Sequence, residues 1–137
     1  MSNSLIKIKR ITMETTIKID VPEDLMSLCT IYNIQPQKVM ECFAKNVSFP
    51  TYYTDVNGKN KWATLFFLQL LDAKEDETET DIGLEEHYLQ HFNDTLARHM
   101  DEHDDDGVKA REAGRNVIRR WQKAVIAERA KYIFEGL

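Results

Sequence analysis

Apolar and polar positions alternate strictly in a short segment near the N-terminus. The apolar positions are Ile17, Ile19 and Val21. Successive side chains of a strand point to opposite faces, so this period of two predicts a strand over residues 16–21. We expect residues 1–15, which precede it, to form an N-terminal arm that either extends the sheet or is loose.

Downstream of this segment, apolar residues recur at a spacing of three and four, which is typical of helices with one buried face. The expected helices span residues 22–33, 36–47, 61–72, 84–103 and 108–134. Pro22 and the two acids after it suit the first turn of a helix, and Pro36 opens the next one in the same way. Phe49 and Pro50 are expected to end the second helix. Apolar side chains cover most of the circumference of the third helix, so we expect it to be the central core helix.

The fold class that this pattern predicts is mainly α, with a short N-terminal strand followed by about five helices. A short connection over residues 104–107 joins the last two helices, so they should pair as a C-terminal antiparallel helical hairpin. We expect residues 16–137 to form a single mainly helical domain. Its helical part covers residues 61–137 and contains an acidic, solvated linker over residues 72–81.

The order of strand, helix and helix over residues 16–48 resembles the ribbon-helix-helix family of dimeric DNA-binding proteins. The resemblance is carried by the alternation in the strand, by Pro22-Glu23-Asp24 at the first helix and by the second helix beginning at Pro36. It implies a homodimer in which two strands pair, bury their apolar side chains and present the alternate side chains to the major groove. The candidate DNA-facing residues on this basis are Thr16, Lys18 and Lys38. Lys38 is included because the family binds a phosphate at the start of the second helix.

Two features of the same segment favour an interaction module that does not bind DNA. Asp20 shares the outward side of the strand with Lys18. The carboxylate of Asp20 would be repelled by the backbone phosphates of DNA. The expected first helix is also about one turn shorter than the family usually shows. The net charge of the whole chain, −5, points the same way.

Charge is strongly segregated along the chain. Residues 72–106 carry 14 acidic and 2 basic side chains, whereas residues 107–137 carry 8 basic and 3 acidic side chains. A cationic stripe repeats every four residues in the last expected helix. Its members are Arg111, Arg115, Arg119 and Lys123. This stripe is a candidate site for phosphates or for a protein partner, although we favour a solvated face that pairs with the acidic segment.

All four histidines fall in one expected helix, as the pairs His87/His91 and His99/His103. A pair separated by four residues can hold a zinc ion from one helical face, and the second pair also matches the H-x-x-E-H pattern of inverted zinc proteases. The two pairs point about 120° apart, so one straight helix cannot join them into a single site. We therefore favour no metal and no other cofactor, with ordinary solvated or paired histidines instead.

The remaining composition narrows the classes of function. No apolar run reaches the roughly 20 residues of a membrane span, and no secretory signal is evident, so we expect a cytoplasmic protein with two reduced cysteines. No glycine-rich phosphate loop or nucleophile elbow occurs, so we expect no enzyme. The sequence thus favours a small non-enzymatic protein-interaction or regulatory module that forms a homodimer. A dimeric ribbon-helix-helix-type DNA-binding regulator is the first alternative, and a metal-binding protein built on the histidine helix is the second.

Overall fold

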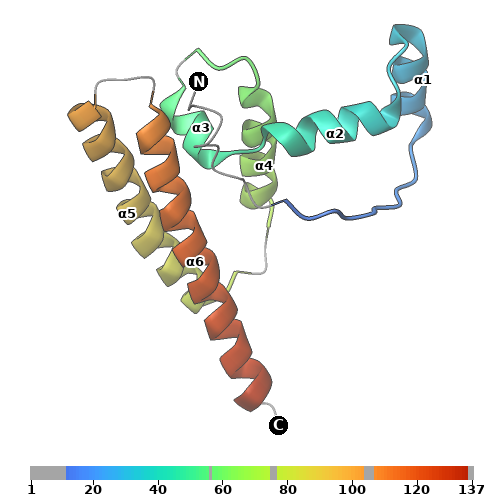
Figure 1. Ribbon diagram of the computed structural model, residues 1–137. Coiled ribbons are helices and arrows are strands. Elements are labelled where there is room, and N and C mark those ends of the chain that lie inside the picture. The colour runs from blue at the N-terminus through green and yellow to red at the C-terminus, as the bar shows by residue number, and fades with distance from the viewer. Residues whose placement is uncertain (1–11, 56, 75–76, 104–106, 136–137) are drawn as a thin grey trace. The chain divides into compact units, whose positions relative to one another are not determined.

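The computed structural model of the chain describes residues 12–55, 57–74, 77–103 and 107–135, with the side chains of 101–103 and 132–135 outside the description. Within these ranges it contains six helices and no strand (Figure 1). The helices are α1 Glu23–Tyr32, α2 Pro36–Asn46, α3 Phe49–Thr54, α4 Lys61–Asp72, α5 Glu79–His103 and α6 Val108–Glu135. The prediction of a mainly helical chain is confirmed, with one helix more than the sequence indicated.

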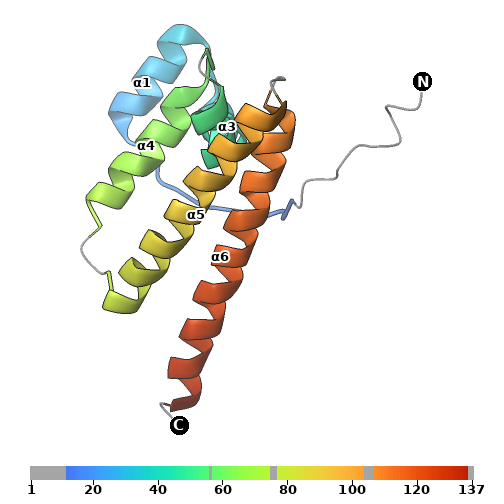
Figure 2. The same ribbon diagram turned by 90° about the vertical axis from the view of Figure 1, so that its left-hand side faces the viewer.

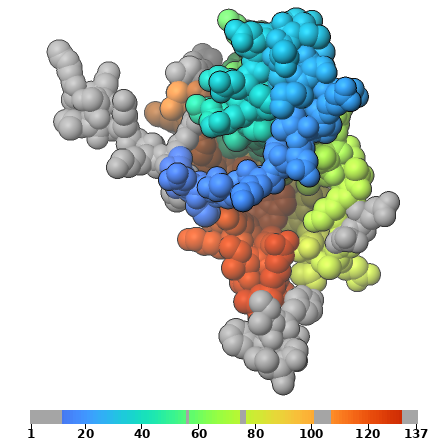
Figure 3. All heavy atoms as spheres, turned by 90° about the vertical axis from the view of Figure 1, so that its right-hand side faces the viewer, coloured from blue at the N-terminus to red at the C-terminus, as the bar shows by residue number. Residues whose placement is uncertain are grey.

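The predicted strand over residues 16–21 is not formed in the single chain. Residues 12–22 belong to no helix or strand, and Figure 3 shows this segment as an extended run that leads into α1. A strand is stabilised by hydrogen bonds to a neighbouring strand, and no other described segment of this chain supplies one. Alternation therefore identified an extended segment, while its pairing with a second copy remains a prediction.

Helix α3 was missed because Phe49 and Pro50 were interpreted as the end of a helix. Ser48 is instead the N-cap of a new helix, and its Oγ accepts a hydrogen bond from the amide of Thr51 over 3.2 Å. Proline suits the first turn of a helix, where its missing amide donor costs nothing. The pair Ser48 and Pro50 is therefore a start signal in this context.

Helix α5 begins earlier than the predicted start at Leu84. Thr78 Oγ1 accepts a hydrogen bond from the amide of Asp81 over 3.1 Å, which caps the first turn. Glu79 and Asp81 place negative charge at the same end, where the helix dipole favours it. The acidic linker is therefore shorter than predicted, because part of its charge belongs to the first turn of α5.

The chain divides into two compact units, the first ending at Val39 and the second beginning at Met40. Unit 1 contains the extended segment and α1. Asn33 ends α1 in the left-handed conformation, with φ 54° and ψ 46°. In this turn the amide of Ile34 donates to the carbonyl of Cys29 over 2.9 Å, which satisfies one of the last carbonyls of the helix.

The core of unit 2 lies between α5 and α6, which run side by side in opposite directions in both Figure 1 and Figure 2. Its buried residues are Phe92, Leu96, Ala110 and Val117, with Phe49, Tyr88 and Ile118 packed against them. Each large apolar side chain buried in this way contributes about 1.5–3 kcal/mol. The predicted C-terminal antiparallel hairpin is confirmed.

Helix α4 is not the central core helix that its composition predicted. Ala63 and Thr64 are buried, whereas its large apolar side chains are mostly exposed in the single chain. The exposed ones are Trp62, Leu65, Phe66, Phe67 and Leu70. No helix in the described part of the chain has both the length and the apolar character that crossing a membrane requires.

Thr64 attaches α4 to the junction between α2 and α3. Its Oγ1 accepts a hydrogen bond from the amide of Ser48 over 2.9 Å, and the side chain is 1% exposed. The carbonyls of Asn46 and Ser48 both lie 3.4 Å from the same hydroxyl, which can donate to one of them. One buried hydroxyl thus satisfies the backbone where the chain leaves α2 and enters α3.

Candidate functional site

A surface groove of about 540 Å³ lies between α5 and α6. Four of the side chains that line it are cations and two are imidazoles. They are Arg98, Arg119, Arg120, Lys123, His91 and His99. No carboxylate is among the described side chains that line the groove, although α5 itself carries many acids. We call this feature the cationic groove.

A contact between His91 of α5 and Arg120 of α6 links the two helices that form the cationic groove. Arg120 Nη2 donates to His91 Nε2 over 3.2 Å. Because a guanidinium has no acceptor, this contact requires Nε2 of the imidazole to be unprotonated. The contact is exposed to solvent, and it orients one cation of the groove.

Arg119 is positioned by neighbours in its own helix. Its Nη1 donates to Asn116 Oδ1 over 2.7 Å and lies 3.6 Å from Glu112 Oε1. Arg98 and Lys123, in contrast, form no ion pair or side-chain hydrogen bond within the described part of the chain. Two of the four cations are thus oriented by the fold, and two are available to an incoming anion.

Thr95 also lines the cationic groove and has an unsatisfied hydroxyl. The residue is 4% exposed, and its Oγ1 has no hydrogen-bond partner in the described structure. Its own carbonyl accepts a hydrogen bond from His99 Nδ1 over 2.9 Å. A buried hydroxyl without a partner costs about 1–3 kcal/mol, so this oxygen is an unusual feature of the groove.

The predicted cationic stripe does not form one surface. A step of four residues rotates the side chain by about 40° around a helix, so the first and last members are about 120° apart. Arg111 Nη1 lies 3.4 Å from Thr54 Oγ1 of α3, and Arg115 pairs with Glu112 over 3.1 Å. Of the four predicted residues, Arg119 and Lys123 are the ones that reach the cationic groove.

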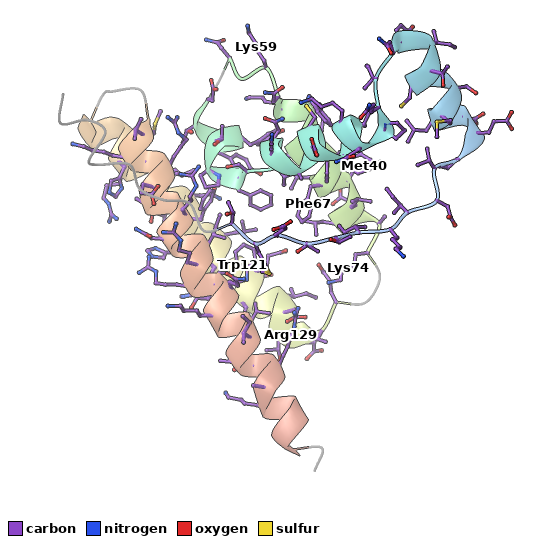
Figure 4. All side chains as sticks on the ribbon, turned by 45° about the vertical axis from the view of Figure 1, so that its right-hand side comes forward. Met40, Lys59, Phe67, Lys74, Trp121 and Arg129 are labelled. Atoms are coloured by element: carbon purple, nitrogen blue, oxygen red, sulfur yellow. The ribbon has the colours of Figure 1, made fainter. Side chains whose placement is uncertain are left out.

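Among the described residues, the predicted pairing between the acidic segment and the last helix has one instance. Arg129 Nη2 of α6 lies 4.0 Å from Asp81 Oδ2 at the start of α5. Arg129 is labelled in Figure 4. Arg115 and Arg119 instead use Glu112, an acid of their own helix.

A second groove, of about 470 Å³, is largely apolar. Phe67 of α4 and Trp121 of α6, both labelled in Figure 4, line it together with Arg115 and Ile118. It offers one guanidinium, which is already paired with Glu112. This groove therefore lacks the set of convergent polar groups that would indicate which ligand it binds.

The histidine pairs lie on α5, where the sequence placed them, and the surface pocket that contains both His87 and His91 is also lined by Glu86 and Asp94. At the first pair, Arg120 occupies the hydrogen-bonding position of His91 Nε2, which a metal ion would need. At the second pair, the side chain of His103 lies outside the described residues. Among the described side chains, no group of three or more His, Cys, Asp or Glu residues is arranged to hold a metal ion.

The candidate DNA-facing residues are all in positions open to solvent. Thr16 and Lys18 are exposed on the extended segment, and Lys38 is exposed in the first turn of α2. The amide of Lys38 already donates to the carbonyl of Gln35 over 2.9 Å, and Pro36 has no amide donor. The start of α2 therefore offers fewer donors for a phosphate than the resemblance implies.

Searches of protein-family models, of curated proteins and of solved structures found no match to this chain. The chemistry of its own residues is therefore the basis for any functional conclusion.

Two cations of the groove, Arg98 and Arg120, were outside the predicted stripe, and Thr95 was not predicted as a site residue either. Arg98 was overlooked because it lies in a segment whose net charge is strongly negative. Arg120 was outside the predicted stripe because it lies one position off the four-residue repeat. The helical-hairpin prediction contained a usable signal. In an antiparallel pair, residues before the connection meet residues after it, which brings Arg98 toward the basic helix.

Proposed function

We propose that the chain is a non-enzymatic interaction module that forms a homodimer through unit 1. The observation that carries this proposal is the burial in that unit. Cys29 is the one buried residue among described residues 12–39, and it is small. Fewer than about 40 residues rarely fold without additional stabilisation such as association. Unit 1 therefore needs a partner surface to cover its apolar side chains.

The side chains available for this association are large and exposed. Ile17 is 74% exposed in the extended segment, and Ile31 and Tyr32 of α1 are 71% and 70% exposed. Ile19 and Leu28 are also exposed. Burying a set of this kind provides the main driving force for protein association.

A second copy is the proposed partner because the segment has an extended run, a helix, a left-handed turn and a second helix, in that order. This order is the one that the ribbon-helix-helix resemblance implies for an intertwined dimer. Pairing of residues 16–21 across a two-fold axis would supply the strand hydrogen bonds that the single chain lacks.

Sedimentation equilibrium over a range of protein concentrations tests the proposal. The wild-type chain should sediment as a dimer, and the double variant Ile17→Lys, Ile19→Lys should sediment as a monomer. Met13→Lys is the matched control, because Met13 is an exposed apolar residue of the same extended segment that lies outside the pairing residues. A monomeric wild type, or an unchanged dimer in the double variant, would overturn the proposal.

A DNA-binding regulator is the second candidate, favoured by the exposure of Thr16 and Lys18 between the apolar positions. Such side chains can contact base edges and phosphates when a two-stranded ribbon enters the major groove. Asp20 and the acidic net charge oppose this use, which is why it ranks second. Fluorescence anisotropy with a random-sequence duplex at low salt is the test. DNA affinity that is equal in wild type and Lys18→Glu would exclude a role of the ribbon.

A further inference from the structure

We propose that the cationic groove between α5 and α6 binds the diphosphate group of a small ligand. The proposal concerns unit 2 alone and does not depend on how unit 1 associates. It rests on the convergence of four cations in a groove with no carboxylate among its described lining residues, on the contacts that orient two of these cations, and on the unpartnered hydroxyl of Thr95.

The charge of the groove indicates the class of ligand. Arg98, Arg120 and Lys123 provide three positive charges, and Arg119 adds a fourth that is shared with Glu112 at 3.6 Å. A single carboxylate would neutralise one of them. A phosphate group carries about −1.5 to −2 at pH 7, so two linked phosphates approach the charge that the groove presents. The same positive side chains would repel a metal cation.

The geometry of the two fixed arginines supports binding of an anion with several oxygens. Arg120 is held by His91 over 3.2 Å, and Arg119 is held by Asn116 over 2.7 Å. Each guanidinium uses one donor atom in these contacts and has further donors in a planar fork that suits phosphate oxygens. Side chains oriented before binding lose less conformational entropy when the ligand arrives.

Arg98 and Lys123 add the mobile part of the proposed site. They come from different helices, Arg98 from α5 and Lys123 from α6. With no ion pair in the described part of the chain, neither has to release a carboxylate before it binds a ligand. A bound anion would therefore bridge α5 and α6.

Thr95 provides the independent observation. Its hydroxyl is buried and unpartnered, yet the residue lines the groove. Threonine commonly satisfies its hydroxyl on a carbonyl one turn earlier in its own helix, which does not happen here. The hydroxyl is covered in the ligand-free chain, so the proposal includes a side-chain movement that exposes it to a phosphate oxygen.

Isothermal titration of the full chain with sodium pyrophosphate, at constant ionic strength, tests the proposal. We expect one site per chain. Lys123→Gln should weaken binding about tenfold or more, since a hydrogen bond to a charged group contributes about 1.5–3 kcal/mol. Lys109→Gln is the matched control, because Lys109 is an exposed cation of α6 that does not line the groove and should leave the affinity unchanged.

Thr95→Val separates a ligand contact from a purely structural role. The variant should weaken pyrophosphate binding about three- to tenfold, as expected for one neutral hydrogen bond, and should raise the unfolding midpoint of the ligand-free chain. A merely structural threonine would not produce both changes. Circular dichroism of each variant confirms that the helices are retained.

Three outcomes would overturn the proposal. The first is the absence of pyrophosphate binding to the wild-type chain. The second is an equal loss of affinity in Lys109→Gln and Lys123→Gln, which would indicate general charge attraction. The third is displacement of pyrophosphate by duplex DNA at concentrations far below those required for a nucleoside diphosphate, which would assign the groove to a nucleic-acid backbone instead.

Discussion

Gly114 of α6 lies against the ring of Phe92 of α5, so closely that a Cβ on Gly114 would stand 2.9 Å from Phe92 Cε2. The same Cβ would stand 3.0 Å from Leu96 Cδ2. Phe92 is fully buried, so its ring has little room to move. The close approach of the two helices in the core of unit 2 therefore depends on the absence of a side chain at this position.

Gly114→Ala should lower the free energy of unfolding by up to about 2 kcal/mol. Overpacking a core costs about 1–3 kcal/mol, and the better helix propensity of alanine returns up to about 1 kcal/mol. Urea unfolding followed by circular dichroism measures the difference. Gly83→Ala in α5 is the control, because a Cβ there meets nothing within 4 Å, and it should stabilise the chain by up to about 1 kcal/mol. Equal effects of the two substitutions would contradict the packing argument.

Thr64→Val should destabilise unit 2 by about 1–3 kcal/mol, because it removes the acceptor of the Ser48 amide while keeping the shape of the side chain. Thr64→Ser retains the hydroxyl and should recover most of the loss. Chemical denaturation of both variants is the measurement. A valine variant as stable as the wild type, or no less stable than the serine variant, would contradict the hydrogen-bond argument.

Asn33→Val should weaken the end of α1 by about 1–2 kcal/mol, since a β-branched residue is strained in the left-handed conformation with φ 54°. Asn33→Gly tolerates the same conformation and serves as the control. Hydrogen exchange of the α1 amides reports the change locally, with faster exchange expected in the valine variant. Unchanged exchange rates would mean that the turn does not limit the stability of α1.

The unfolding midpoint of unit 1 should rise with protein concentration if a second copy covers its apolar side chains. Association with the folded state stabilises that state by mass action, so the midpoint of a dimer depends on concentration. Thermal melts over a hundredfold range of protein concentration provide the measurement. Hydrogen exchange of the α1 amides at the same concentrations shows whether unit 1 is the part that is stabilised. A midpoint that is independent of concentration would show that no second copy stabilises this unit.

The sequence predicted the helical hairpin well, because Phe92, Leu96 and Val117 follow a regular helical period over long helices. It failed at α3 and at the start of α5, where the decisive signals were local caps at Ser48 and Thr78. In both places Pro and acidic residues were given more weight than the capping side chain beside them. It also failed for α4, since composition measures how apolar a helix is and not which neighbours are available to cover it.

The site residues were harder to predict than the helices. A repeat of four residues was interpreted as one cationic surface, but the rotation of about 40° per step directs Arg111 and Lys123 to different neighbours. The unsatisfied state of Thr95 has no sequence signature, because it depends on the three-dimensional positions of all nearby acceptors. The cationic groove combines residues from two helices that carry opposite average charge.

The arrangement of the core between α5 and α6 has a consequence for how the chain acquires its structure. These helices are consecutive, so the contacts between Phe92 and Val117 close a short stretch of chain and lose little loop entropy. Folds dominated by such local contacts form within microseconds to milliseconds. Unit 1, if it requires a second copy, becomes ordered in a bimolecular encounter whose rate is proportional to concentration. A newly synthesised chain would thus have a folded groove before it has a dimer, and dilution would slow the second event without slowing the first.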